Sequence, residues 1–334
     1  MSGEKRVIIT KTPFRVHIAG GGDIADYYTK YGDGAFVSGA LNRYMYITVS
    51  RYFFENSIRA HYALMENDVT NVDEINHPSI RECLKFTGIT KGVQINSIAD
   101  FPARGTGVGS SSSFAVGLLN ALHSYKGEKV SPEQLAREAV YIEREVLREA
   151  GGKQDQYMAA YGGIKLLVFK KDGTVDVKDV EMKKKDIGEL EKHLLLMYTG
   201  KERSSSSIHV NQGAEAGSHV DAYRKMVDLA YKLYAAYQDG RWMETGKILH
   251  ENWELKKTLA SGISDQYLNR LYKTAIENGA EGGELMGAGG GGFFMFFADP
   301  DKHERIIEAL PEARAERFGF EMEGSKVIYE QGSL

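Results

Sequence analysis

The sequence predicts a mixed α and β protein, with a strand-rich first part and a helix-rich second part that meet near residue 190. Its 334 residues are enough for two domains of ordinary size. Short β-branched or alternating segments, which are typical of strands, are found mainly in the first part. Apolar residues at three- and four-residue spacing, which indicate amphipathic helices, dominate the second part.

Four strands are predicted in the first part. Arg6 to Thr10 is β-branched, and Phe14 to Ala19 continues this pattern until the glycines 20–22 interrupt it. Ala40 to Tyr52 alternates and is rich in residues that favour strands. Ile164 to Phe169 is a short apolar run of the same kind. These segments make the first part of the chain rich in strands and loops.

The tetrapeptide Ser131-Pro132-Glu133-Gln134 predicts the start of a helix. Serine can cap the helix, proline is tolerated at the first helical position, and glutamine three residues after the serine completes a capping box. We expect this helix to run to about Ala150, because Gly151 and Gly152 follow.

The second part is predicted from its periodicity, which favours two strands and three helices. The strands are expected at 194–198 and 293–297, and the helices at 222–238, 242–257 and 265–277.

Composition and charge exclude several classes of protein. The net charge of −4 gives no reason to expect nucleic acid or an anionic membrane as a partner. No apolar run approaches the roughly 18 residues of a membrane span, and the N-terminus does not resemble a signal peptide. Cys83 is the single cysteine, which rules out an internal disulfide and suits the cytoplasm. We therefore expect a cytoplasmic protein with no membrane or nucleic-acid partner.

The segment PARGTGVGSSSSFAVG, residues 102–117, predicts a phosphate-binding loop. Gly105, Gly107 and Gly109 allow backbone N–H groups to approach an anion, and a helix that begins near Ser111 adds further free N–H groups. A flexible surface loop is the alternative, although the position between apolar segments argues against a linker. The segment lacks the lysine of a P-loop, and its GxGxG pattern differs from the dinucleotide fingerprint GxGxxG.

Two carboxylates are candidates for chemistry next to this loop. Glu143 is expected on the apolar face of the helix at 132–150, together with Ala139, Val140, Val146 and Leu147. A buried carboxylate is unfavourable unless a metal ion or a salt bridge compensates it, and an exposed helix edge is the other possibility. Asp155, in GGKQDQYMAAYGG, is either a base for a substrate hydroxyl or a helix cap.

Several motifs, in order, resemble those of the GHMP small-molecule kinases. Residues 102–117 resemble the family's P-x-x-x-G-L-G-S-S motif, with Val108 where leucine is usual. GGKQDQY resembles the G-x-x-x-D-Q stretch of its sugar kinases, and LMGAGGGGFFMFF at 285–297 resembles its C-terminal glycine motif. TPFRVHIAGGGDIADYY at 12–28 resembles the sugar-kinase opening. With TGKERSSSS and HENWELKK, the chain is most similar to the branch that phosphorylates D-glycero-D-manno-heptose 7-phosphate.

The resemblance implies a two-domain α+β fold, with residues 1–190 like ribosomal protein S5 domain 2 and residues 191–334 ferredoxin-like. The active site would lie in the cleft between them. The implied substrates are ATP and a sugar phosphate, which would be phosphorylated at its anomeric hydroxyl to heptose 1,7-bisphosphate. A homodimer is compatible with the family.

The resemblance also implies residue roles. Asp155 would orient and deprotonate the acceptor hydroxyl, Arg15 would keep Asp155 ionised, and Mg²⁺ would be held by Ser111 and Glu143. The sugar hydroxyls would meet Gly21, Gly22 and Asp23. The phosphates of ATP would be bound by Gly105, Gly107, Gly109, Ser110, Ser111, Ser112, Gly289 and Gly290. For a phosphate already on the acceptor, the candidates are Arg104, Lys153, Lys201 and Arg203, with the serines 204–207.

Two departures and three alternatives accompany this interpretation. The turn GGGD at 20–23 lacks the threonine of the usual GGGTD, and Glu284 stands where relatives often carry lysine, so a positive charge is expected to be missing near the site. The alternatives are a kinase for an unphosphorylated sugar of the fucose or galactose type, a non-catalytic sugar or nucleotide sensor, and a dinucleotide-dependent oxidoreductase.

Overall fold

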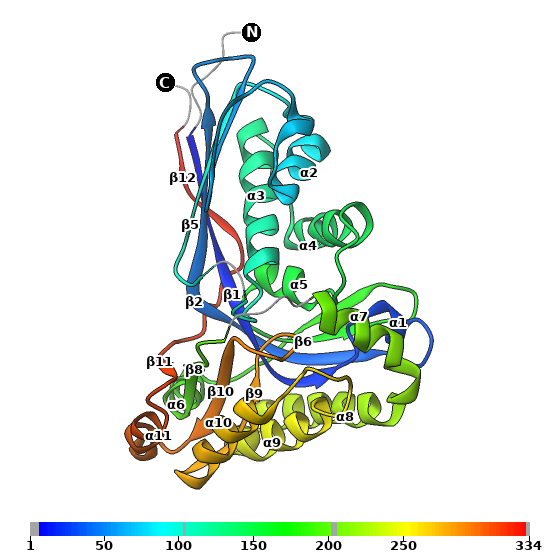
Figure 1. The fold of residues 1–334 in the computed structure, drawn as a ribbon, viewed down its shortest axis with the longest axis vertical. Helices are drawn as coiled ribbons and strands as arrows, with labels where there is room; N and C mark the ends of the chain where they lie inside the picture. Colours follow the sequence, from blue (N-terminus) through cyan, green and yellow to red (C-terminus); the bar gives the residue numbers. More distant parts are fainter. Residues whose placement is uncertain (1–6, 103–104, 202–205, 332–334) are drawn as a thin grey trace.

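The computed structural model describes residues 7–102, 105–201 and 206–331, in which two sheets are flanked by helices (Figure 1). Within these ranges the larger sheet has eight strands, in the order β12-β1-β2-β5-β3-β4, with β6 paired to β2 and β7 paired to β6. The smaller sheet has four strands in the order β11-β8-β10-β9. The predicted mixture of strands and helices is confirmed.

The strands of the larger sheet are β1 (Val7–Gly21), β2 (Gly34–Arg51), β3 (Ile58–His61), β4 (Met65–Val69), β5 (Val93–Ala99), β6 (Ile164–Phe169), β7 (Val175–Asp179) and β12 (Lys326–Glu330). Those of the smaller sheet are β8 (Leu194–Tyr198), β9 (Ala280–Leu285), β10 (Phe293–Ala298) and β11 (Arg314–Glu316). The α-helices are α1 (Ala25–Tyr28), α2 (Pro78–Thr87), α3 (Ser110–Lys126), α4 (Pro132–Val140), α5 (Gln154–Tyr161), α6 (Lys184–His193), α7 (Ser206–Glu215), α8 (Val220–Gln238), α9 (Thr245–Lys256), α10 (Gln266–Glu277) and α11 (His303–Ala309).

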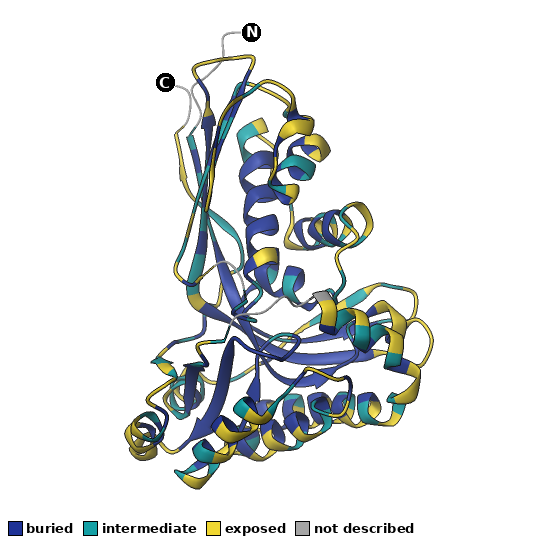
Figure 2. Cartoon of the chain, in the orientation of Figure 1, coloured by how far each residue is buried: buried dark blue, intermediate teal, exposed yellow. Residues whose placement is uncertain are grey.

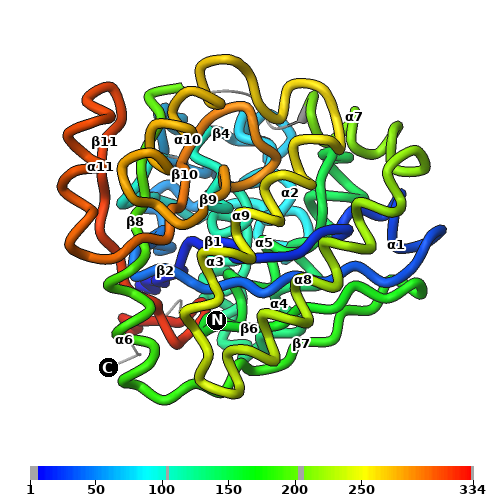
Figure 3. Tube along the Cα trace, turned by 90° about the horizontal axis from the view of Figure 1, so that it is seen from below, coloured from blue at the N-terminus to red at the C-terminus, as the bar shows by residue number. Residues whose placement is uncertain are grey.

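The long antiparallel pair of β1 and β2 runs through both halves of the molecule (Figure 1). Burial alternates along β1 up to Lys11 and is continuous from Thr12 to Gly21, so the second half of the strand is covered on both faces (Figure 2). Helix α3 packs on β1 and β2, and α8 and α9 also contact β1, as the view from below shows (Figure 3). Side chains in this half of β1 therefore lie at the centre of the molecule.

Helix α3 begins and ends at glycines in the left-handed region. Its N-cap Gly109 has φ 78° and its C-cap Gly127 has φ 81°. The helix is buried over most of its length, because Phe114, Val116, Leu118 and other apolar residues pack between the sheet and α2. The predicted helix start near Ser111 is confirmed.

The helix predicted at 132–150 ends earlier than expected. The Ser131 hydroxyl accepts a hydrogen bond from the Gln134 N–H, but the Gln134 side chain donates to Glu138 instead of completing the capping box. After Val140 the chain widens into a π-helical turn, η2 (Tyr141–Val146). The extra residue in this turn changes the helical register, so Val146 is 39% exposed and its predicted inward position is wrong.

The C-terminal part of the chain returns to the larger sheet. Strand β12 pairs with β1, and Phe320 forms a bridge with Leu41 of β2. The division into residues 1–190 and 191–334 stays a prediction. Cys83 is buried and free, as expected. No helix within the described ranges is both long and apolar enough to cross a membrane.

The core position of α3 can be tested with a matched pair of leucines. Leu118 has no exposed area, whereas Leu64 is 64% exposed. We expect Leu118→Ala to lower the free energy of unfolding by about 2–5 kcal/mol, because it leaves a cavity in the core. Leu64→Ala should change it by less than about 0.5 kcal/mol. Urea unfolding followed by circular dichroism measures both, and equal effects would contradict the assigned packing.

Candidate active site

A cavity of about 700 Å³ lies where the N-terminus of α3, the buried half of β1, α5 and the loop between β9 and β10 meet. It has the size of a small-ligand site. The predicted site residues that border it are Arg15, Gly21, Gly22, Asp23, Gly105, Gly107, Gly109, Ser110, Ser111 and Asp155. The structure therefore brings the predicted phosphate loop, carboxylate and glycine turn to one cavity.

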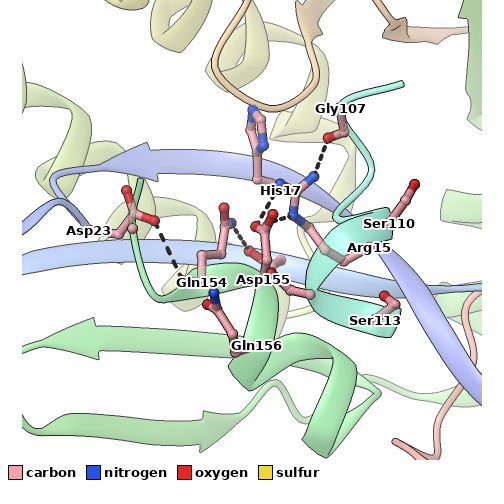
Figure 4. Close-up of polar contacts among 12 residues, drawn as sticks. Arg15, His17, Asp23, Gly107, Ser110, Ser113, Gln154, Asp155 and Gln156 are labelled. Atoms are coloured by element: carbon pink, nitrogen blue, oxygen red, sulfur yellow. Dashed lines mark hydrogen bonds and ion pairs between the residues drawn. The ribbon is translucent and has the colours of Figure 1, made fainter. Parts of the chain in front are cut away.

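Arg15 joins Asp155 to the glycine loop (Figure 4). Its Nε and Nη2 atoms donate to Asp155 Oδ1 at 2.8 and 2.6 Å, and its Nη1 donates to the carbonyl of Gly107. Arg15 is only 4% exposed. No described residue donates a hydrogen bond to the second oxygen, Oδ2, of Asp155. Arg15 thus fixes the carboxylate and leaves one of its oxygens available.

The glycine loop requires glycine for two reasons. Gly105, Gly107 and Gly109 have φ values of 72°, 76° and 78°, in the region that other residues rarely adopt. An added Cβ at Gly107 would overlap the backbone carbonyl of Met286, and one at Gly109 would lie 3.4 Å from Asp155 Oδ2. The loop therefore packs backbone against backbone on the second glycine motif and lies next to the free oxygen of Asp155.

The second glycine motif contributes different residues to the cavity than predicted. Gly287, Ala288 and Gly291 border it. The N–H of Gly290 donates to the carbonyl of Ile263 at 2.7 Å, and Gly289 also packs against Ile263. The predicted role of Gly289 and Gly290 in nucleotide binding stays a prediction.

Glu143 is buried beside the N-terminus of α3. It is 1% exposed and accepts hydrogen bonds from Ser111 at 3.3 Å, from Ser112 at 2.8 Å and from Gln156. Within the described ranges no lysine, arginine or histidine forms an ion pair with it. The two alternatives, an exposed helix edge and a buried salt bridge, are therefore wrong for the described part of the chain. A buried carboxylate with only neutral partners favours a bound cation.

Asp23 lies at the other end of the cavity, against the backbone of 152–154. An added Cβ at Gly152 would overlap its carboxylate, and the Gln154 N–H lies 3.5 Å from its Oδ2. Burial, together with the negative charge of Asp155, raises the pKa of Asp23 to about 6. The attraction of Arg144 and Arg15 opposes this rise.

Sequence reasoning missed several residues that border the cavity, namely His17, Arg144, His209, Gln212, Tyr223 and Lys256. His17 could have been found, because it follows Arg15 by two residues on a strand and must share its face. Arg144 donates from Nε to the carbonyl of Gly152 at 2.9 Å and from Nη1 to that of Glu149 at 3.2 Å. Its orientation depends on the π-helical turn, which the sequence pattern does not reveal.

Other predicted residues lie elsewhere. Lys153 donates to the carbonyl of Gly173 at 2.6 Å and does not border the cavity. Lys201 pairs with Asp265. Arg104 and Arg203 lie outside the described residues, as do Ser204 and Ser205. The cap alternative for Asp155 is wrong, because the N-cap of α5 is Lys153.

Glu284 is completely buried and borders the same cavity. It pairs with Lys256 at 3.0 Å and with His17 at 2.9 Å. Position 284 itself carries no positive charge, as expected. Lys256 of α9 supplies a positive charge beside it and neutralises the Glu284 carboxylate.

Two family models match the chain. Residues 77–163 match the model of the GHMP kinases N terminal domain, and residues 229–316 match that of the GHMP kinases C terminal. The first match contains the phosphate loop, Glu143 and Asp155, and the second contains Glu284 and the second glycine motif.

Known proteins resemble the chain over nearly its whole length. It is 31% identical to the D-glycero-alpha-D-manno-heptose 7-phosphate kinase of Campylobacter jejuni, over 96% of this chain and 98% of that protein. A D-glycero-D-manno-heptose 1-phosphate kinase from Bacteroides thetaiotaomicron superposes with a TM-score of 0.79 at 25% identity, over 97% of this chain and 99% of that chain. The Lactococcus lactis galactokinase, with a TM-score of 0.77 at 16% identity over 96% of this chain and 95% of that chain, shares the fold.

The raised pKa of Asp23 has a testable cause. The pKa of Asp23 is about 6 in the folded protein and 3.8 in the absence of the fold. Ionisation of Asp23 therefore lowers the free energy of unfolding as the pH rises from about 4 to about 6. We expect Asp155→Asn to lower the pKa of Asp23, since it removes a neighbouring negative charge. Carbon-13 NMR titration of aspartate carboxyl groups measures this. The control Asp26→Asn, on α1 with a 54% exposed side chain, should leave the pKa unchanged. An Asp23 midpoint that is the same with and without the Asp155 charge would contradict the geometry.

Proposed function

The chain belongs to the GHMP kinase family, and on this basis we propose that it transfers the γ-phosphate of ATP to the anomeric hydroxyl of D-glycero-D-manno-heptose 7-phosphate. The product is the 1,7-bisphosphate. The observation that carries this proposal is Asp155, which borders the cavity while Arg15 binds its Oδ1 beside the phosphate loop and leaves Oδ2 without a described donor. The acceptor sugar is inferred from the near full-length similarity to the heptose 7-phosphate kinase of C. jejuni.

The phosphates of ATP bind at the start of α3. Gly105, Gly107 and Gly109 leave the backbone N–H groups uncovered, and the first turn of the helix adds free N–H groups and a partial positive charge. Ser110 and Ser111 border the cavity at the same point. The second glycine motif covers this loop and closes one side of the nucleotide site.

A magnesium ion fits the residues around Glu143. The oxygens of Glu143 and Ser111 are the hard ligands that Mg²⁺ prefers, and the ion commonly takes only one or two protein ligands besides phosphate and water. When bound, the ion neutralises charge on the transferring phosphate.

Asp155 and Arg15 act on the acceptor. The sugar oxygen attacks the γ-phosphorus, ADP leaves, and the hydroxyl proton moves to Oδ2 of Asp155. Arg15 orients the carboxylate before the reaction, because its Nη2 lies 2.6 Å from Oδ1. Gly21, Gly22 and Asp23, at the other end of the cavity, bind sugar hydroxyls.

Arg144 is our proposed partner for the phosphate that the acceptor already carries. Among the described arginines and lysines that border the cavity, Arg15 pairs with Asp155 and Lys256 pairs with Glu284. Arg144 is instead held mainly by backbone carbonyls, and its closest carboxylate oxygen lies 4.0 Å away on Glu149. It lies next to Gly151, close to the Asp23 end.

A kinase for another sugar is the second candidate, because the residues around Asp155 do not depend on the rest of the acceptor. A sensor needs no base beside a phosphate loop, so Asp155 argues against it. The GxGxG pattern of the loop, which differs from the dinucleotide fingerprint GxGxxG, argues against an oxidoreductase. A cytoplasmic location and a homodimer stay predictions.

The proposed reaction predicts which acceptor is used. ADP release should occur with ATP, Mg²⁺ and heptose 7-phosphate and be much slower with galactose, fucose or mannose. Asp155→Asn should lower kcat by about 10²–10⁴-fold, because it removes the base without changing its shape. The exposed residue Asp301 supplies the control Asp301→Asn. Turnover limited to an unphosphorylated sugar would refute the heptose phosphate assignment.

The assignment of Arg144 predicts a selective loss of acceptor affinity. Arg144→Gln should raise KM for heptose 7-phosphate by about 10–100-fold, the value of a charged hydrogen bond, with KM for ATP unchanged. Lys153→Gln should change neither constant, because Lys153 is directed away from the cavity. Steady-state kinetics with each substrate varied in turn measures this. A larger effect at Lys153 than at Arg144 would contradict the assignment.

A further inference from the structure

His17 lies between the two ends of the cavity. It follows Arg15 by two residues on β1, and the turn with Gly21 and Asp23 comes next along the chain (Figure 4). The side chain is 3% exposed and borders the cavity. The nucleotide and catalytic roles proposed above do not use it.

The imidazole is part of a buried network that joins the two sheets. Glu284 of β9 accepts hydrogen bonds from Lys256 Nζ at 3.0 Å and from Asn252 Nδ2 at 2.7 Å, and its Oε1 lies 2.9 Å from His17 Nε2. Asn252 also binds the N–H and the carbonyl of Gly20, just before the glycine turn. Asn252 and Lys256 of α9 therefore hold Glu284 against β1. Because Glu284 contacts His17, they also fix the position of the imidazole.

This network contacts one nitrogen of His17, Nε2, through both Glu284 and Lys256. Burial alone would raise the pKa of Glu284, but the charge of Lys256 and the contact with His17 lower it to about 2. The carboxylate needs a donor at Nε2, whereas the Lys256 ammonium, whose Nζ lies 3.1 Å from the same atom, needs an acceptor there, so the network occupies Nε2 in either tautomer. Burial and the charge of Lys256 lower the pKa of His17 to about 4, which keeps the ring neutral at pH 7. Nδ1 is therefore the ring nitrogen that is left to bind a ligand, as a donor or as an acceptor.

The Nδ1 atom has no hydrogen-bond partner among the described residues, although it is buried. Leaving a buried polar atom unpaired is unfavourable, and such atoms in native proteins commonly have a ligand, a water or a catalytic role to explain them. Four described side chains have unpaired buried atoms of this kind, and of these His17 borders the cavity.

We propose that His17 is a specificity-determining residue of the acceptor site, whose Nδ1 forms a hydrogen bond with a hydroxyl of the bound sugar, since a hydroxyl can both donate and accept. Glu284 and Lys256 act as positioning residues that hold the imidazole in place. This rests on the proposed function, because it requires an acceptor sugar in this part of the cavity. Since Nδ1 is covered in the described conformation, the sugar reaches it after a small side-chain movement at the wall, of the kind common on binding.

Two substitutions separate the contact from the network. His17→Gln places an amide nitrogen near the Nε2 position, so it can still donate to Glu284 but offers no polar atom at the position of Nδ1. We expect it to raise KM for heptose 7-phosphate by about 3–10-fold, the value of one neutral hydrogen bond, with KM for ATP and the melting temperature unchanged. His17→Asn, which keeps a polar group near Nδ1 but loses the link to Glu284, should lower the melting temperature.

Nitrogen-15 NMR of the histidine-labelled wild-type protein gives a direct readout. The Nδ1 resonance of His17, identified by its loss in His17→Gln, should shift when heptose 7-phosphate is added without ATP and should not shift with ADP alone. A purely structural His17 would show neither this shift nor the selective change in KM.

The outcomes distinguish this inference from the proposed function. If heptose 7-phosphate is not phosphorylated but another sugar of the panel is, the proposed function is wrong and the same measurements are made with that sugar. If Nδ1 responds to no sugar of the panel, or if His17→Gln changes both KM values equally, the role of His17 is overturned.

Discussion

The hydrogen bonds of Arg15 to Asp155 and to the carbonyl of Gly107 are the interactions on which the site depends. They connect α5, which carries the carboxylate, to the loop before α3, whose geometry suits a phosphate. Arg15 can make both because the second half of β1 is buried on both faces and holds its side chain in one place. A buried guanidinium needs acceptors, and these two are the groups that a phosphoryl transfer must bring together.

The glycine-loop end of the cavity, where we propose that the nucleotide binds, is built from backbone more than from side chains. The loop at 105–109 and the loop at 286–292 approach so closely that a methyl group at Gly107 or Gly292 would overlap the facing carbonyl. Such contact is possible only for glycine, which explains why both segments are recognisable in the sequence. The opposite end is different, since Asp23 and His17 contact partners far away in the chain, and Arg144 is held by backbone carbonyls that follow the π-helical turn.

This difference decides what could be predicted. The start of α3, the strand β6 and the burial of Glu143 follow from local patterns, and all three are found in the structure. The network around Glu284 could not be predicted, because its contact with His17 spans 267 residues of sequence. The π-helical turn was missed for a related reason: one extra residue per turn leaves no periodic signal, yet it exposes Val146 and directs Arg144 to the cavity.

The most direct test of the central claim is a crystal structure with Mg²⁺, a non-hydrolysable ATP analogue and heptose 7-phosphate. Our account predicts the γ-phosphate over residues 105–111 and the anomeric oxygen of the sugar within hydrogen-bond distance of Asp155 Oδ2, with Arg15 still bound to Oδ1. A sugar whose anomeric oxygen faces away from Asp155, or an Arg15 that has left Asp155, would contradict it.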